Sequence, residues 1–340
     1  MSTTLPEPKP LQEWHEVTRE IFETQIRAAG KPALLKGLAA SWPVTEISRK
    51  SSVAAAEYLT AMASDAKIMT FLGKPEMEGR FFYRDDMRGF NFERREIAIK
   101  SVIAKLMEIF DDPSPMSIYA GAGPSSNLFP GFANENPMPL LDDQISPRVW
   151  IGNAARVAPH FDASENIACA VRGSRRFLLF PPDQVNNLYI GPLEVTMAGP
   201  PASMVDPIAP DLDRYPRYRD AMEQALVADL KPGDAIYIPS LWWHYVRSFE
   251  PFNILVNYWW GNDTTGAGLA ALAHGLLSIR DLPLQEKQAW RALFDHYVFG
   301  ENAAKAAEHL PDHIRGVLGE STPERDQKIV AFLIGGLSEL

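Results

Sequence analysis

The sequence has little cysteine, no excess of positive charge and no long apolar run, and each shortage excludes a class of protein. Cys169 is the single cysteine among 340 residues, so the chain can form no internal disulfide and no cysteine-built metal site. The 33 lysines and arginines are outnumbered by 43 aspartates and glutamates, which gives a net charge of -10. Such a charge attracts no phosphate backbone, and we therefore expect no nucleic-acid partner.

A membrane partner is not expected either. No stretch of about 18 apolar residues runs without charged or turn-forming residues. The N-terminal stretch MSTTLPEPKPLQEW is polar and proline-rich, and it lacks the apolar segment of a signal peptide. Hydrophobic residues make up 46% and charged residues 22%, as in an ordinary globular protein. Together with the single cysteine, these features predict a cytoplasmic protein.

The distribution of apolar residues divides the chain into three predicted parts. Residues 1–113 mix helix-like and strand-like stretches, which predicts an α/β flank that completes the core sheet. Residues 114–262 contain short apolar runs separated by Gly, Pro, Asp and Asn, a pattern typical of an all-β barrel or sandwich. Residues 263–340 have helical periodicity to the end and form a predicted helical subdomain.

Periodicity and capping signals locate individual elements within these parts. In the flank we expect helices over 15–29, 53–63 and 95–110 and a buried strand over 32–37. In the C-terminal part we expect helices over 265–280, 284–299, 302–318 and 322–340. Thr322 followed by Pro323 is a typical N-cap and first helical residue. The proline-rich segment 200–218, between strand-like runs, is expected to be an ordered insertion.

Two of the seven histidines lie in settings that suggest a metal site. His160 and Asp162 are two residues apart in PHFD, and residues at i and i+2 of a β-strand project from the same face. His244 lies in PSLWWHYV, just after the turn-and-strand unit KPGDAIYIP. Two histidines and one carboxylate form the facial triad of non-haem Fe(II) oxygenases. An H-x-D pair is common by chance, and His244 alone could be a core residue, so the combination carries the prediction.

The runs PHFDASENIACAVRGSRRFLLFPPDQVNNLY, LKPGDAIYIPSLWWHYV and NILVNYWW resemble the cupin-like branch of the JmjC oxygenases. The resemblance is dense over 117–262 and thinner over 15–116. It implies a mainly β fold with α elements, in which a double-stranded β-helix (cupin or jelly-roll) core joins the N-terminal flank and the helical C-terminal subdomain. It also implies that His160, Asp162 and His244 are the catalytic metal ligands for Fe(II), with 2-oxoglutarate and O2 consumed and succinate and CO2 released.

The same resemblance assigns Arg175 to the distal carboxylate of 2-oxoglutarate. In the asparaginyl hydroxylases of the branch this position holds lysine. Arginine can bind a carboxylate through two parallel hydrogen bonds, but it is longer than lysine and not interchangeable with it. Because side chains alternate along a strand, only one of Arg175 and Arg176 can point inward. The alternative for Arg175 is a surface arginine on a strand edge.

Three further residues match cosubstrate-binding positions of the family. Asn166 and Asn257 match amides near the chelating end of 2-oxoglutarate, and Tyr119 matches a tyrosine that bonds its distal carboxylate. A structural hydrogen-bonding role is the alternative for all three. Val157 stands where the family has threonine, so one expected hydroxyl donor is missing. These departures leave open the identity of the dicarboxylate or keto acid.

Substrate and assembly are predicted by analogy. The family implies hydroxylation of a protein or peptide side chain, or of a small amino-acid-like molecule, and a homodimer formed through the C-terminal helices. One alternative is a cupin that holds Zn or Mn for isomerase-type or structural purposes. Another is a non-catalytic interaction module, which would have no chemical reason to keep three ligand residues. Histone demethylation is disfavoured, since the sequence shows no zinc-binding or chromatin-reading appendage.

Overall fold

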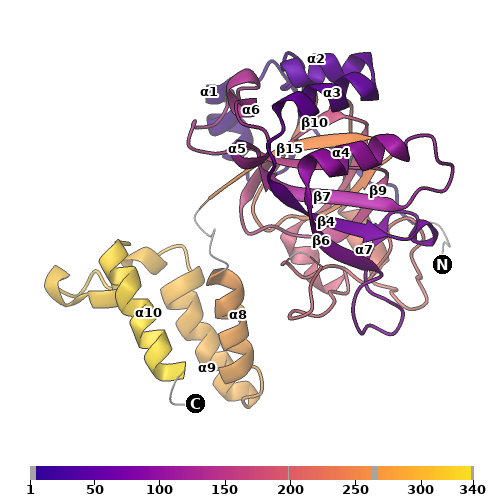
Figure 1. The fold of residues 1–340 in the computed structure, drawn as a ribbon. Helices are drawn as coiled ribbons and strands as arrows, with labels where there is room; N and C mark the ends of the chain where they lie inside the picture. The colour runs from indigo at the N-terminus through magenta and orange to yellow at the C-terminus, as the bar shows by residue number, and fades with distance from the viewer. Residues whose placement is uncertain (1–4, 198, 262–266, 338–340) are drawn as a thin grey trace. The chain divides into compact units, whose positions relative to one another are not determined.

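A computed structural model describes residues 5–197, 199–261 and 267–337 (Figure 1). The chain separates into two compact units, Met1–Thr265 and Gly266–Leu340. Among the described residues, no helix combines the length and the apolarity needed to cross a membrane. The three-part division at residues 113 and 262 stays a prediction.

The first unit is built on two β-sheets that share one buried core. The smaller sheet has the order β1 (Lys9–Pro10), β12 (Leu226–Leu230), β11 (Arg175–Phe180), β14 (Trp243–Ser248), β9 (Ala155–His160), β5 (Arg80–Phe81). The larger has the order β2 (Glu13–His15), β3 (Ala33–Lys36), β13 (Ala235–Ile238), β10 (Glu165–Arg172), β15 (Asn253–Trp260), β8 (Arg148–Gly152), β7 (Ser117–Pro124), β4 (Lys67–Gly73), β6 (Phe92–Ala98). The predicted jelly-roll core is confirmed, and strands from the first hundred residues extend the larger sheet.

The space between the two sheets is filled by residues that alternate along the strands. Phe177 and Leu179 of β11 pack in one buried cluster with Ala168 and Ala170 of β10. The intervening residue Cys169 faces the other side of the larger sheet and is fully buried there. Alternate residues of β10 are therefore buried on opposite faces of the sheet, as expected for a central strand covered on both sides.

Helices cover the outer face of the larger sheet, as Figure 1 shows for α2 (Pro43–Lys50), α3 (Ser52–Met62) and α4 (Ile99–Glu108). The remaining helices of this unit are short: α1 (Arg19–Ile21), α5 (Ser125–Leu128), α6 (Phe132–Glu135) and α7 (Tyr218–Glu223). The helix expected over 95–110 begins only at Ile99, because residues 92–98 pair with β4 as a strand. The helix expected over 15–29 begins at Arg19, where Thr18 caps it, and continues as a π-helical segment to Arg27.

The outer face of the smaller sheet is covered by the insertion between β11 and β12. Tyr218 of α7 is fully buried there against Phe180 and Tyr245. A single bridge joins Ala202 of the insertion to His160 at the end of β9. The expected ordered insertion thus lies beside the predicted metal site.

The second unit consists of α8 (Ala267–Ser278), α9 (Leu284–Phe294) and α10 (Pro323–Leu337), with a π-helical turn at Asp295–Phe299. The helix expected over 302–318 is wrong, since this segment forms three separate 3-10 turns. Pro311 cannot donate a helical hydrogen bond, and it disfavours helix at the residue before it. The Thr322 cap is confirmed, because its Oγ1 accepts from the Arg325 N–H at 3.2 Å. The expected helix positions 265–266 and 338–340 lie outside the described residues.

Candidate metal centre and active site

One end of the barrel gathers the predicted metal ligands. His160 is the last residue of β9 and pairs in register with His244, the second residue of β14. Asp162 lies two residues further on, just beyond the end of β9. The other strands that reach this end are β8, which begins at Arg148, β10, which begins at Glu165, and β15, which ends at Trp260. We call this end the mouth.

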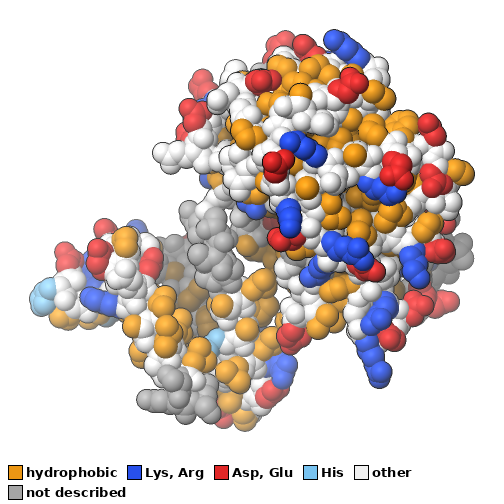
Figure 2. All heavy atoms as spheres, viewed as in Figure 1, with side chains coloured by type: hydrophobic (Ala, Val, Ile, Leu, Met, Phe, Trp, Pro, Cys, Tyr) orange, Lys and Arg blue, Asp and Glu red, His pale blue; other side chains and the backbone are white. Residues whose placement is uncertain are grey.

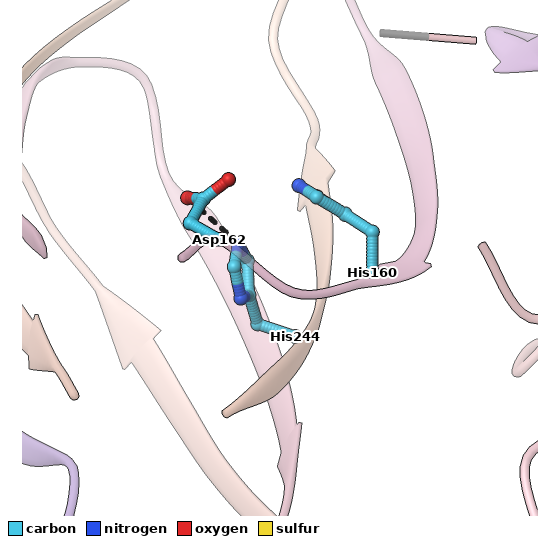
Figure 3. A group of neighbouring side chains, drawn as sticks. All are labelled: His160, Asp162 and His244. Carbon is cyan, nitrogen blue, oxygen red and sulfur yellow. Dashed lines mark ion pairs between the residues drawn. The ribbon is translucent and has the colours of Figure 1, made fainter. Parts of the chain in front are cut away.

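The three side chains converge at the mouth, as Figure 3 shows. One ligand atom from each of His160, Asp162 and His244 lies within 4.8 Å of the other two. Asp162 Oδ2 is 3.7 Å from His244 Nε2, and the two imidazole centroids are 4.3 Å apart. These separations suit donors around one ion, and a direct hydrogen bond would be shorter. His244 is buried, while His160 and Asp162 are half-buried.

Backbone carbonyls fix the tautomer of both imidazoles. His160 Nδ1 lies 2.9 Å from Ala158 O, and His244 Nδ1 lies 3.0 Å from Trp242 O. A carbonyl oxygen only accepts, so each Nδ1 must carry the hydrogen and each Nε2 keeps its lone pair. Such carbonyl contacts orient metal-ligating histidines. Two neutral imidazoles and a carboxylate fit Fe(II), and also Zn(II) or Mn(II).

The environment of His244 favours its neutral form. Burial is the main cause and the neighbouring His160 the second, and together they lower the pKa of His244 to about 4 although Asp162 partly opposes both effects. A neutral imidazole is the form that binds a metal.

Trp259 orients the carboxylate of the group. Its indole Nε1 donates to Asp162 Oδ2 at 3.2 Å. The Trp259 ring meets the Trp150 ring edge to face, with centroids 6.1 Å apart. The sequence predicts that Trp259 packs in the core near the mouth or lines a substrate groove, and it does not predict the bond to Asp162. Trp259 follows Asn257 by two residues and so shares its face of β15.

The opposite end of the barrel contains a buried cation. We call it the closed end. Arg175 is 2% exposed, whereas the neighbouring Arg176 is exposed and pairs with Asp229. Arg175 is therefore the inward residue of the pair. It is opposite Ser248 in β14, four residues from His244, which corresponds to about 13 Å along a strand. Among the described residues no carboxylate lies within 4.0 Å of Arg175, and its Nε has no hydrogen-bond partner.

Tyr119 lies beside this arginine. It is opposite Gly152, the last residue of β8, and its hydroxyl lies near the Arg175 guanidinium, whose charge acts on it. Burial raises the pKa of Tyr119 to about 12, although the positive charge of Arg175 opposes the shift. Burial lowers the pKa of Arg175, but arginine does not lose its proton in proteins. The closed end thus offers a cation and a hydroxyl donor to an anion.

The two predicted amides lie near the mouth and bond each other. Asn257 Nδ2 donates to Asn166 Oδ1 at 3.4 Å, and Trp150 Nε1 donates to Asn257 Oδ1 at 2.9 Å. Both asparagines are buried. Val157 pairs with Val246, so this position of the barrel is apolar where the family supplies a hydroxyl. Their contact with a cosubstrate stays a prediction.

Comparison with known proteins agrees with this arrangement. The family model described as "Cupin-like domain" matches residues 18–266. The human "Bifunctional peptidase and (3S)-lysyl hydroxylase JMJD7" is 36% identical over 129 residues, which cover 33% of this chain and 40% of that protein. "Jumonji C domain-containing protein 5" of Drosophila melanogaster is 35% identical over 117 residues, which cover 34% of this chain and 28% of that protein.

A longer match is to "Lysine-specific demethylase JMJ31" of Arabidopsis thaliana, 25% identical over 272 residues. It covers 72% of this chain and 48% of that protein. The chain therefore spans less than half the length of these relatives. With a jelly-roll barrel, a histidine and carboxylate cluster at its mouth and a family match over most of its length, the chain belongs to the cupin-like family that includes Jumonji C proteins.

Proposed function

We propose that this chain is an Fe(II)- and 2-oxoglutarate-dependent oxygenase. The observation that carries the proposal is the pair of complementary sites in one barrel. His160, Asp162 and His244 converge at the mouth, and Arg175, a buried cation with no carboxylate of the described residues within 4.0 Å, lies at the closed end. A buried unpaired charge is costly, so its presence indicates that an anion binds there. A dicarboxylate keto acid can bridge a metal and a cation in this arrangement.

The residues of the chain have distinct roles in this proposal. His160, Asp162 and His244 would hold Fe(II), while Arg175 and Tyr119 would bind the distal carboxylate of 2-oxoglutarate. The bound metal and cosubstrate supply the oxidising chemistry: 2-oxoglutarate is oxidised to succinate and CO2, and one oxygen atom of O2 enters a substrate C–H bond. The protein orients the ligands through backbone carbonyls and Trp259, and its apolar barrel limits access of water.

The substrate proposal is hydroxylation of a protein or peptide side chain, or of a small amino-acid-like molecule. One relative is named a lysyl hydroxylase and another a lysine-specific demethylase, which supports amino-acid side chains as targets. The insertion next to His160 is available to contact such a substrate, because it carries the exposed apolar residues Leu193 and Val195.

A Zn- or Mn-holding cupin with an isomerase-type or non-catalytic role is the second candidate. The donor set at the mouth fits those ions as well. That candidate gives no reason for a buried Arg175 at the closed end unless the arginine binds a different anion. The two candidates differ in whether a keto acid is consumed.

Succinate formation tests the oxygenase proposal. Purified protein supplied with Fe(II), 2-oxoglutarate and O2 should form succinate, and Asp162→Ala should reduce the rate at least a hundredfold because one metal ligand is lost. Asp229→Ala is the matched control, since Asp229 pairs only with Arg176 on the barrel exterior. Succinate formation that is independent of Asp162, or equal rates with Zn(II), would contradict the proposal.

We further propose that the chain forms a homodimer through its C-terminal unit. Large apolar side chains of this unit are exposed, including Leu277, Leu284, Phe299 and Phe332 at 64, 64, 75 and 79%. Figure 2 shows orange side chains over its visible face. Many exposed large apolar side chains in one unit support a protein interface there. Cytoplasmic residence and the lack of nucleic-acid and membrane partners stay predictions from the composition.

A further inference from the structure

Arg148 is a second arginine that faces the inside of the barrel. It is the first residue of β8 and pairs in register with Asn257 of β15, which in turn pairs with Ala168 of β10. Residues directly opposite each other in antiparallel strands project from the same face. Ala168 lies in the core between the sheets, and the Asn257 amide bonds inward to Asn166 and Trp150. Arg148 therefore projects inward at the mouth.

One side chain, that of Trp259, links the guanidinium of Arg148 to Asp162 of the candidate metal site. Its Cζ is 5.7 Å from the centroid of the Trp259 ring, and the indole N–H of Trp259 bonds Asp162. Strand β8 begins at the end of the barrel where β9 ends, so Arg148 and His160 share the mouth. Arg175, by contrast, is opposite Ser248 at the closed end. The two arginines thus lie at opposite ends of the barrel interior.

The charge of Arg148 has no counter-ion in the described part of the chain. No carboxylate of these residues lies within 4.0 Å of it. The structure records one hydrogen bond for its five N–H groups, a long one of 3.3 Å from Nη2 to Ala122 O. Its Nε is buried and has no partner. Glu165, the first residue of β10, is bound by Arg27 and by Tyr237, which packs on the other face of the larger sheet.

We propose that Arg148 binds a carboxylate of the substrate and selects anionic substrates for the oxygenase. This inference rests on the proposed function. A guanidinium with free donors matches a carboxylate in both charge and geometry, and the flat Trp259 ring holds it in a defined orientation. The carboxylate can belong to a free amino-acid-like molecule or to an acidic residue of a peptide. Both sources present the same chemical group.

The position of Arg148 favours substrate over cosubstrate as the bound anion. A 2-oxoglutarate whose distal carboxylate is at Arg175 and Tyr119 reaches toward the metal from the closed end. Arg148 approaches from the mouth, on the side where Trp259 and the end of β9 open to a substrate. Removing Arg148 should therefore change substrate affinity and leave 2-oxoglutarate affinity unaltered.

Matched acid and amide probes test the proposal on the full chain loaded with Fe(II) and 2-oxoglutarate without O2. One arm uses the N-acetyl derivatives of the common amino acids as free acids and as primary amides. The other uses end-capped tripeptides with a central Glu or Gln. Binding is measured by titration calorimetry and by the change in the visible band of the iron complex. The arm in which the acid is preferred identifies the source of the carboxylate.

The variants are Arg148→Gln and Arg148→Lys, with Arg247→Gln as control. Arg247 also lies over an aromatic ring, that of Phe249 at 4.8 Å, but it is opposite Arg176 and faces out of the barrel. Arg148→Gln therefore removes a positive charge from the inside of the barrel, and Arg247→Gln removes the same charge from its outside. The wild type and Arg247→Gln should prefer the acid in at least one pair by tenfold or more, Arg148→Gln should lose the preference, and Arg148→Lys should retain part of it.

Equal affinity of the wild type for acid and amide probes, or no binding of any acid probe, would overturn the proposal. A weaker affinity of Arg148→Gln for 2-oxoglutarate, with the acid preference retained, would overturn it too and would assign Arg148 to the cosubstrate. Failure of the wild type to form an iron and 2-oxoglutarate complex contradicts the oxygenase function instead. A normal complex without acid preference contradicts the role of Arg148 alone.

Discussion

A buried arginine without a carboxylate partner destabilises a protein until an anion binds beside it. Arg175 is such a residue, since it is 2% exposed and no carboxylate of the described residues lies within 4.0 Å of it, although the charge of Glu250 acts on it from farther away. Replacing Arg175 with Met removes the charge and keeps most of the volume. The ligand-free variant should therefore be as stable as the wild type or more stable, while its affinity for 2-oxoglutarate should fall.

The fall in affinity has a defined size. Hydrogen bonds to charged groups contribute about 1.5–3 kcal/mol, which corresponds to roughly a tenfold to hundredfold increase in Kd for Arg175→Met. The Kd of Arg175→Lys should lie between the values for the wild type and Arg175→Met, because lysine keeps the positive charge but lacks the planar guanidinium. Calorimetric titration measures the affinity for 2-oxoglutarate, and thermal unfolding measures the stability of the ligand-free protein. Unchanged Kd in Arg175→Met would show that the arginine does not bind the cosubstrate.

Cys169 gives a second prediction for a single residue. Burial raises the pKa of its thiol, and the thiolate is the reactive form. The native protein at pH 8 should not react with a thiol-specific reagent within minutes. The denatured protein should react with one equivalent of the reagent per chain. Rapid labelling of the native chain would mean that β10 opens to solvent.

The sequence alone predicted which three side chains form the candidate metal site, but not their supporting residues. His160, Asp162 and His244 are recognisable because two-residue spacing on a strand and the KPGD turn place them near one end. The carbonyl partners of the imidazoles and the inward position of Arg148 depend on the register between strands, which alternation alone does not determine.

At the scale of elements, one carboxylate of the insertion between β11 and β12 pairs with two arginines of the barrel. Asp206 lies 3.4 Å from Arg80 of β5 and 3.5 Å from Arg156 of β9, and its side chain is 16% exposed. Because Asp206→Ala leaves two half-buried arginines without this partner, it should destabilise the fold by about 2 kcal/mol. It should also expose the insertion to proteolysis.

Asp229→Ala is the matched control for that prediction. Asp229 makes two 2.7 Å hydrogen bonds to Arg176, but both side chains are more than half exposed. Solvent screening should limit its loss of stability to about 1 kcal/mol or less. Equal losses for the two variants, measured by urea unfolding, would show that Asp206 does not anchor the insertion.

Local patterns predicted the fold class better than the element boundaries. Residues 92–98, FERREIA, have the composition of an exposed helix start, yet they form a strand because β4 offers an edge for pairing. Tertiary pairing overrides such weak local preferences. In the C-terminal unit, Pro311 and the glycines at 316 and 319 divide residues 302–318 into 3-10 turns.

At the scale of the whole molecule, the proposed homodimer is testable with one exposed side chain. Light scattering of the full chain should give twice the mass of 37.9 kDa at micromolar concentration. Phe332→Asp should shift the mass toward the monomer, because Phe332 is 79% exposed within α10 and would carry a charge into an apolar interface. Val185→Asp, at a 50% exposed apolar position of the first unit, should have no effect. A monomeric wild-type chain would contradict the proposal.

Formation of the ternary complex tests the central claim that one barrel holds a metal at its mouth and a keto acid between that metal and Arg175. Without O2, purified metal-free protein is titrated with Fe(II) and then with 2-oxoglutarate, and the visible metal-to-ligand charge-transfer band is recorded. The band should appear in the wild type, be absent in His160→Ala and require more 2-oxoglutarate in Arg175→Met. Tight binding of Zn or Mn with no band on addition of Fe(II) and 2-oxoglutarate would contradict the claim and favour a metal-binding cupin of another function.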